Sequence, residues 1–173
     1  TVFVMRHAEK AETPAEDPPL SPAGEARALE LAQHFGRAPK TLGFDSIGVT
    51  DPAAIGNAGK HFREFLDAGA HGDMDWLAAQ PARRMDPRVL WPGVRSIIML
   101  GVNYGPDENP LALLDQRTRG AISAYAQGDD YHDVIKKRLK MLARWLVAAS
   151  GEEVKVFIDT AAVMEKPLAQ AAG

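Results

Sequence analysis

Apolar and polar positions follow patterns along the chain that predict both strands and helices. The run Arg95–Tyr104 (RSIIMLGVNY) is almost continuously apolar, which is typical of a central strand buried on both faces. Val154–Ile158 predicts a second, shorter strand. Between the two, a helix is predicted to begin after Asp129 and Asp130. Its apolar stripe consists of Ile135, Leu139, Leu142 and Leu146.

Proline, glycine and capping residues mark further element boundaries after residue 43. Strands are predicted at 44–50 and 120–125. Asp51 followed by Pro52 predicts a helix start, and Gly69 predicts a left-handed cap at the end of that helix. The apolar residues predicted to be buried by this helix are Ile55, Phe62, Phe65 and Leu66.

Three shorter segments complete this region. Pro87 disfavours helix at the preceding Asp86, so Pro81–Pro87 is predicted to be a loop. Leu111–Asp115 is predicted to be a short helix. Ala161–Ala172 has helical composition.

The first 36 residues predict a strand, a loop and a helix. Thr1–Met5 (TVFVM) reads as a short buried strand, and Arg6 and His7 follow it directly. A helix over 21–35 opens with a serine cap and a proline at its first position.

These elements predict an α+β fold with three parts. Residues 1–36 form an extra N-terminal βα unit, residues 37–43 form a join rich in glycine, proline and basic residues, and residues 44–173 form the main domain. A mixed sheet is expected there, covered by helices at about 52–68 and 130–149.

Composition narrows the class of protein. The chain has 173 residues, 46% hydrophobic and 25% charged, the balance of an ordinary globular domain. A net charge of −3 argues against nucleic-acid binding by bulk charge alone, although a local basic patch remains open. No apolar run reaches the length of a membrane span and no signal layout opens the chain, so no membrane partner and a cytoplasmic location are expected. The absence of cysteine removes disulfides, thiolate metal sites and iron–sulfur ligands, and no metal site is predicted.

Asp159 is the first candidate for chemistry. It follows the predicted strand 154–158, and the ends of strands open into crevices where folds often place ligands. The alternative is that Asp159 or Thr160 only caps the next helix. Glu165 and Lys166 are predicted to be exposed helix residues.

Two further sets of residues have alternative interpretations. Arg83, Arg84 and Arg88 are either a solvated surface cluster or an anchor for an anionic or amide-rich ligand, which guanidinium groups suit. Between Ser123 and His132, aromatic side chains including Tyr131 surround a Gly-Asp-Asp turn. They either pack at the helix start or form an aromatic wall for a flat macrocycle.

Four segments resemble one family. In chain order they are GFDSIGVT, HGDMDWLAAQPARRMDPRVLWPGVRSIIMLGVNY, GAISAYAQGDDYHDVIKKRLKMLARWL and FIDTAAVMEKPLAQAAG. Together they resemble the N-terminal catalytic domain of the epoxyqueuosine reductases, cobalamin-dependent enzymes of tRNA queuosine synthesis. The resemblance covers about residues 40–173.

The resemblance implies a fold, a cofactor and a site. The fold is expected to be related to the nitroreductase-like class, with cobalamin as cofactor and tRNA as the substrate of the full-length parent. Arg84 and Ser123 would contact cobalamin, and Tyr131 and His132 are typical of the family near the same ligand. Asp159 would be the general acid above the cobalt. Burial beside the macrocycle would raise its pKa so that it could donate a proton at neutral pH.

The same resemblance implies that this chain is incomplete. The family carries its iron–sulfur clusters in a cysteine-rich region downstream, so clusters are expected only there and this chain is expected to be inactive alone. The face left by the missing region is predicted to favour self-association.

The beginning of the chain resembles a second family. VMRHAEK and DPPLSPAGEARALELA resemble the opening of the histidine phosphatases, the phosphoglycerate mutase-like superfamily. That resemblance implies a phosphohistidine at His7 beside a phosphate-binding Arg6. No matching second arginine, acid or second histidine follows. A natural or artificial chimera is therefore predicted, with a phosphomonoester hydrolase using His7, or a non-catalytic remnant, as the alternative functions.

Overall fold

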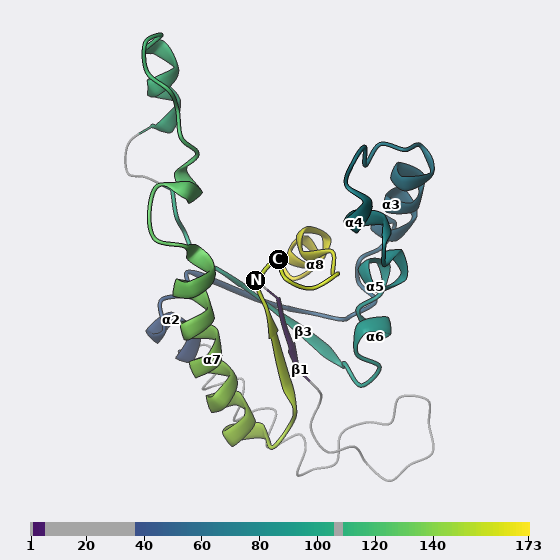
Figure 1. Ribbon diagram of the computed structural model, residues 1–173. Coiled ribbons are helices and arrows are strands. Elements are labelled where there is room, and N and C mark those ends of the chain that lie inside the picture. Colours follow the sequence, from purple (N-terminus) through teal and green to yellow (C-terminus); the bar gives the residue numbers. More distant parts are fainter. Residues whose placement is uncertain (1, 6–36, 106–108) are drawn as a thin grey trace.

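A four-stranded antiparallel sheet forms the centre of the protein (Figure 1). The computed structural model describes residues 2–5, 37–105 and 109–173. The strands are β1 (Val2–Met5), β2 (Ser46–Thr50), β3 (Ser96–Gly101) and β4 (Val154–Phe157), in the spatial order β2–β3–β1–β4.

The α+β class is confirmed, but the predicted mixed sheet is wrong for the strands described, because each neighbouring pair is antiparallel. β3 and β4 do run in the same direction. They are not neighbours, because β1 lies between them and pairs with both. The strand of the predicted N-terminal βα unit thus belongs to the same sheet as the main domain. The helix predicted at 21–35 lies outside the described residues.

β3 fulfils the prediction of a central strand and divides the core in two. Ile97 and Met99 pack on one face of the sheet with Leu168. Ile98 and Leu100 pack on the opposite face with side chains of the long helix α7, Leu142 among them. Alternate residues of a strand point to opposite faces, so a nearly continuous apolar run is what two covered faces require.

Helix α7 (Tyr131–Ser150) covers one of these faces, as predicted. The Asp130 carboxylate accepts a hydrogen bond from the His132 backbone N–H and caps the helix start, and Gly151, with φ of +72°, ends it in a left-handed cap. The predicted stripe supplies three fully buried leucines and a partly buried isoleucine.

The opposite face is covered by α8 (Glu165–Ala171), whose Leu168 is fully buried. The helix predicted from residue 161 begins four residues later, and its N-cap is Met164, without a side-chain cap. The interpretation of Asp159 or Thr160 as a helix cap is therefore wrong. β2 approaches the end of α8 so closely that a β-carbon at Gly48 would meet the carbonyl of Ala172.

Four short helices project from the sheet and form a separate group, which we call the helical lobe (Figure 1). They are α3 (Ala58–Asp67), α4 (Asp75–Ala78), α5 (Pro81–Met85) and α6 (Pro87–Leu90).

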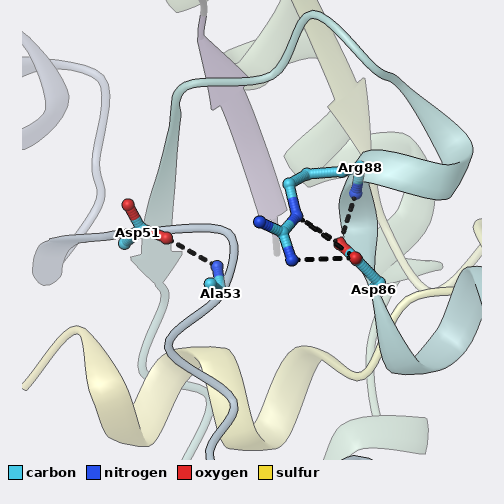
Figure 2. Close-up of polar contacts among 4 residues, drawn as sticks. All are labelled: Asp51, Ala53, Asp86 and Arg88. Carbon is cyan, nitrogen blue, oxygen red and sulfur yellow. Dashed lines mark hydrogen bonds and ion pairs between the residues drawn. The ribbon is translucent and has the colours of Figure 1, made fainter. Parts of the chain in front are cut away.

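Three predictions in and beside this lobe need correction. The first helix begins at Ala58, because Asp51 instead closes a tight turn by accepting a hydrogen bond from the Ala53 N–H at 2.6 Å (Figure 2). α3 has no buried side chain, and Phe65 is exposed. The predicted loop at 81–87 is helical up to Met85, although Asp86 before Pro87 is extended, as expected.

The remaining elements are short. α2 (Ala38–Thr41) lies in the predicted join, and η1 (Pro110–Asp115) confirms the short helix expected there. The strand predicted at 120–125 is wrong, because that segment contains only the 3₁₀ turn η2 (Ala124–Ala126). Gly69 confirms the predicted left-handed cap, with φ of +65°.

Candidate functional site

A pocket of about 860 Å³ opens where β3, β4 and α7 meet. Its walls come from the end of β3 and the residues after it, the turn around η2, the first turns of α7, and the residues that follow β4. Apolar side chains form much of the wall, and a carboxylate, Asp159, stands on its rim. The apolar lining residues include Leu100, Val102, Val134, Ile135 and Ile158.

Asp159 has an unusual backbone. Its φ is +50°, the one positive value among the described non-glycine residues. Such a conformation is uncommon for residues with a side chain, although aspartate tolerates it better than most. Strained backbone of this kind is often found where a structure fixes a functional group.

Tyr131 and Asp159 come from different elements and meet at the pocket. The Tyr131 hydroxyl, on the first residue of α7, donates a hydrogen bond of 2.6 Å to Asp159 Oδ2. This bond holds the pKa of Asp159 below its usual range, and the nearby Glu165 and His132 act in the same direction. Burial opposes them. The prediction of a raised pKa is therefore wrong for the protein without a ligand.

His132 lies beside this pair. Its ring stacks on the Tyr131 ring with centroids 4.1 Å apart, and its Nδ1 lies 2.8 Å from Asp130 Oδ1. Hydrogen bonds from the His132 backbone and side chain lower the pKa of Asp130. The helix cap thus also orients the imidazole, and through it the tyrosine ring.

Glu165 was missed by the sequence reasoning, which predicted an exposed helix residue. Its side chain is half-buried, and its Oε1 accepts a hydrogen bond of 3.2 Å from the Asp159 backbone N–H. Burial raises the pKa of Glu165, and the negative charge of Asp159 raises it further. Two carboxyl groups with pKa values displaced in opposite directions are a pattern of acid–base sites. Lys166 is exposed, as predicted.

The arginine cluster lies away from this pocket, in the helical lobe. Arg88 is engaged with Asp86 through bonds of 2.9 to 3.1 Å (Figure 2), which lower the pKa of Asp86. Arg83 donates to Gln80 at 2.9 Å. The Arg84 guanidinium carbon lies 5.2 Å from the centre of the Trp76 ring, and Arg84 Nε is buried with no hydrogen-bond partner among the described residues.

The structure therefore brings together only part of the predicted site. Asp159 and Tyr131 line one pocket, with His132 stacked beside them. Ser123 is exposed and directly precedes η2, where Ala124 lines the pocket. Arg84 is not among the lining residues, and Arg6 and His7 lie outside the described residues.

The described part of the chain lacks two kinds of feature. It contains no group of three or more histidine, aspartate or glutamate side chains placed to hold a metal ion. It also contains no helix with the length and apolar character needed to cross a bilayer.

The fold thus places an apolar wall beside the carboxylates of Asp129 and Asp159 and the guanidinium of Arg138, an arrangement that suits an apolar ligand with polar edges. Part of the chain is also similar to a known protein family. Residues 84–160 match the family model described as "Epoxyqueuosine reductase QueG, DUF1730". This match contains α7, β4, Asp159 and Tyr131.

Curated relatives are similar over more of the chain. The epoxyqueuosine reductase of Pseudomonas aeruginosa is 37% identical over 156 residues, which is 89% of this chain and 42% of the relative. Those of Vibrio cholerae and Escherichia coli are each 34% identical over 146 residues, 83% of this chain and 39% and 38% of the relatives. No solved structure matches the chain.

The extent of these matches bears on the predicted division between residues 1–36 and the main domain. The chain spans about two fifths of the length of the curated relatives it matches. The matched share of the chain is larger than everything after residue 36, so part of the segment 1–36 also lies within the similarity to the reductases.

Proposed function

We propose that this chain binds cobalamin in the pocket beside Asp159 and acts as the catalytic domain of an epoxyqueuosine reductase, which reduces epoxyqueuosine to queuosine in tRNA. The observation that carries the proposal is the 2.6 Å hydrogen bond between Tyr131 and Asp159 at the pocket. It unites two residues that the family resemblance assigns to one site although they lie 28 positions apart.

The residues present suit such a cofactor. A flat, largely apolar macrocycle needs an open apolar wall, which the ends of β3 and β4 and the first turns of α7 supply. The cofactor's amide side chains need polar partners at its edge. Gln127, Asp129 and Arg138 stand among the lining residues and can supply such partners.

The reaction fixes what the protein must do. Removing the epoxide oxygen breaks both of its C–O bonds, forms a carbon–carbon double bond and releases the oxygen as water. It therefore consumes two electrons and two protons. Bound cobalamin would supply the electrons through low-valent cobalt.

In this proposal Asp159 delivers a proton to the oxygen as negative charge builds on it. An apolar macrocycle over the pocket would exclude water from Asp159 and raise its pKa from the lowered value of the free protein. Tyr131 keeps the carboxylate aimed along the pocket rim, because its hydroxyl holds one of the two carboxylate oxygens.

Other parts of the proposed reaction need residues outside the region that this chain shares with its relatives. The relatives extend well beyond the region that this chain matches, and the chain has no cysteine. We therefore place the iron–sulfur clusters, which would return electrons to the cofactor, and much of the tRNA contact in a downstream region. A cytoplasmic location is part of the same proposal.

A pocket-filling substitution tests the binding step on the 173-residue chain. The chain should change the absorption spectrum of cob(II)alamin when the two are mixed. Ala124→Trp, in the pocket wall, should weaken this binding at least about tenfold because the indole occupies the ligand's space. Ala148→Trp, on the exposed side of α7, is the matched control and should bind normally. A folded chain that gives no spectral change, or equal binding by both variants, would contradict the proposal.

The acid role is tested separately, in a chain extended to supply the clusters. Asp159→Asn retains size and polarity but has no acidic proton. Cobalamin should still bind, while reduction of the epoxide in tRNA should fall by roughly 10²–10⁴, the usual range for an acid–base group. An Asp159→Asn enzyme with full activity would show that the proton comes from elsewhere.

A further inference from the structure

The Asp159 backbone needs support that its own segment does not provide. Its φ of +50° lies in the left-handed region, and glycine, which adopts that region freely, is absent at this position. The turn after β4 has no helix until Glu165, so no helical hydrogen bonds fix it.

Glu165 is placed to give that support. It is the first residue of α8, and three positions later Leu168 is fully buried in the core on that face of the sheet. This anchor holds the half-buried Glu165 side chain next to the turn. Its Oε1 accepts the Asp159 backbone N–H at 3.2 Å.

Asp159 is thus held at two points by two elements. Glu165 on α8 binds its backbone, and Tyr131 on α7 binds its carboxylate. The two helices lie on opposite faces of the sheet, so the residue between them is fixed relative to both. The Tyr131 hydroxyl lowers the pKa of Asp159, and the neighbouring Glu165 adds to this effect. Burial raises the pKa of Glu165, so Glu165 is the member of the pair that keeps its proton to higher pH.

We propose that Glu165 is the positioning residue of Asp159 and its proton partner: it holds the left-handed backbone that directs the Asp159 carboxylate to Tyr131, and it shares a proton with that carboxylate. This inference deepens the proposed function. The release of oxygen as water consumes two protons. Asp159 delivers one, and Glu165 then passes its own proton to the emptied Asp159 carboxylate, which delivers the second.

Two variants separate the structural part of this role from the proton. Glu165→Gln retains an oxygen that accepts the Asp159 N–H but has no exchangeable acid proton. Glu165→Ala loses both. Lys166→Ala, at the exposed neighbouring position, is the matched control. All measurements use the 173-residue chain without cofactor.

Hydrogen exchange of the Asp159 amide reports the backbone contact. Glu165→Ala should speed this exchange at least about tenfold, because an amide that loses its acceptor opens to solvent. Glu165→Gln and Lys166→Ala should leave it near the parent rate. An Asp159 amide that exchanges equally in the parent and in Glu165→Ala would overturn the positioning role.

A carboxyl titration reports the shared proton. The ¹³C signal of the Asp159 carboxyl should move in two steps with pH in the parent, one for each member of the pair, since coupled groups titrate together. In Glu165→Gln it should move in one step. A single step in the parent, or two steps that persist in Glu165→Gln, would overturn the shared proton.

These outcomes are distinct from those for the proposed function. A chain that shows the exchange and titration effects but leaves the cobalamin spectrum unchanged refutes the cofactor proposal and keeps the carboxyl pair. A chain that binds cobalamin but shows neither effect refutes the carboxyl pair and keeps the cofactor proposal.

Discussion

Helices α7 and α3 both carry an apolar stripe, but the two stripes differ in burial. α7 buries Leu139, Leu142 and Leu146 completely against the sheet. α3 buries no side chain, and Phe65 on it remains 37% exposed. The difference lies in what each helix faces. The sheet covers the stripe of α7, whereas α3 packs mainly against the short helix α5 of its own lobe. Apolar spacing therefore predicts a helix, and the partner surface decides its burial.

The same contrast separates the residues that the sequence predicted for the site. Asp159, Tyr131 and Glu165 stand at the ends of elements packed on the sheet, and hydrogen bonds of 2.6 and 3.2 Å join them. Arg84 stands in the helical lobe, with a buried nitrogen that has no partner among the described residues. Packing against the sheet gives the acidic residues at the pocket a fixed geometry before any ligand binds, whereas Arg84 lies outside that pocket.

Truncating one side chain in each helix should give the largest contrast. Leu142→Ala should lower the free energy of unfolding by about 2–5 kcal/mol, because a fully buried leucine leaves a cavity. Phe65→Ala should cost less than about 1 kcal/mol, since much of that ring already meets water. Urea unfolding followed by circular dichroism measures both. Equal losses would mean that the lobe packs as firmly as the sheet region.

The sequence predicted the sheet-packed region well, because there the local pattern and the tertiary structure agree. β3 and α7 bury most of the residues that their periodicity selected, and the apolar side chains of β4 are partly buried. It failed where a local signal had no tertiary support. Asp51 looked like a helix cap but closes a turn, and the segment 120–125 looked like a strand but pairs with nothing in the described structure. The antiparallel pairing was also missed, because β1 enters the sheet from the far end of the chain.

For the site, sequence and resemblance selected Asp159, Tyr131 and His132, which the structure places together. They could not select Glu165. It stands in a segment with helical composition, where a glutamate is ordinarily solvated, and its role depends on where α8 starts and on the left-handed backbone of Asp159. Neither feature leaves a periodic signal. The lowered pKa of Asp159 was missed for a related reason, since it follows mainly from one contact, the Tyr131 hydroxyl.

Substitution of one glycine beside the sheet and one in the helical lobe should give the next largest difference in stability. At Gly48 a β-carbon would meet the backbone carbonyl of Ala172, so Gly48→Ala should cost about 1–3 kcal/mol as the end of α8 is pushed away. At Gly59 on α3 the added carbon would lie 3.4 Å from Met85 Cβ, an ordinary contact. Gly59→Ala should therefore stabilise by up to about 1 kcal/mol through helix propensity.

Thermal unfolding measures both glycine variants. Because α8 carries Glu165, Gly48→Ala should also speed exchange of the Asp159 amide, while Gly59→Ala should not. A harmless Gly48→Ala would show that α8 is free to shift, and it would weaken the argument that α8 fixes the carboxyl pair.

The smallest effect on stability is expected at the Asp86–Arg88 pair of the helical lobe. It should appear as a dependence of stability on pH. Hydrogen bonds from Arg88 lower the pKa of Asp86 in the folded protein, so the ionised carboxylate stabilises the fold above its unfolded pKa of about 3.9. This contribution is lost as the pH falls through the lowered folded value. Asp86→Asn retains an oxygen to accept the Arg88 backbone N–H and removes only the charge. The stability difference between parent and variant should therefore be constant from about pH 5 to 7 and should shrink towards zero in stronger acid.

Salt provides the control for this charge effect. The Arg88 side chain is exposed and that of Asp86 is partly exposed, so the difference at neutral pH should be small and should decrease as ionic strength rises and screens the pair. Urea unfolding at several pH values and two salt concentrations measures it. A difference that is insensitive to salt and grows in acid would assign the role of Asp86 to its backbone cap alone. It would also mean that the lobe, like the region packed on the sheet, is held by geometry more than by charge.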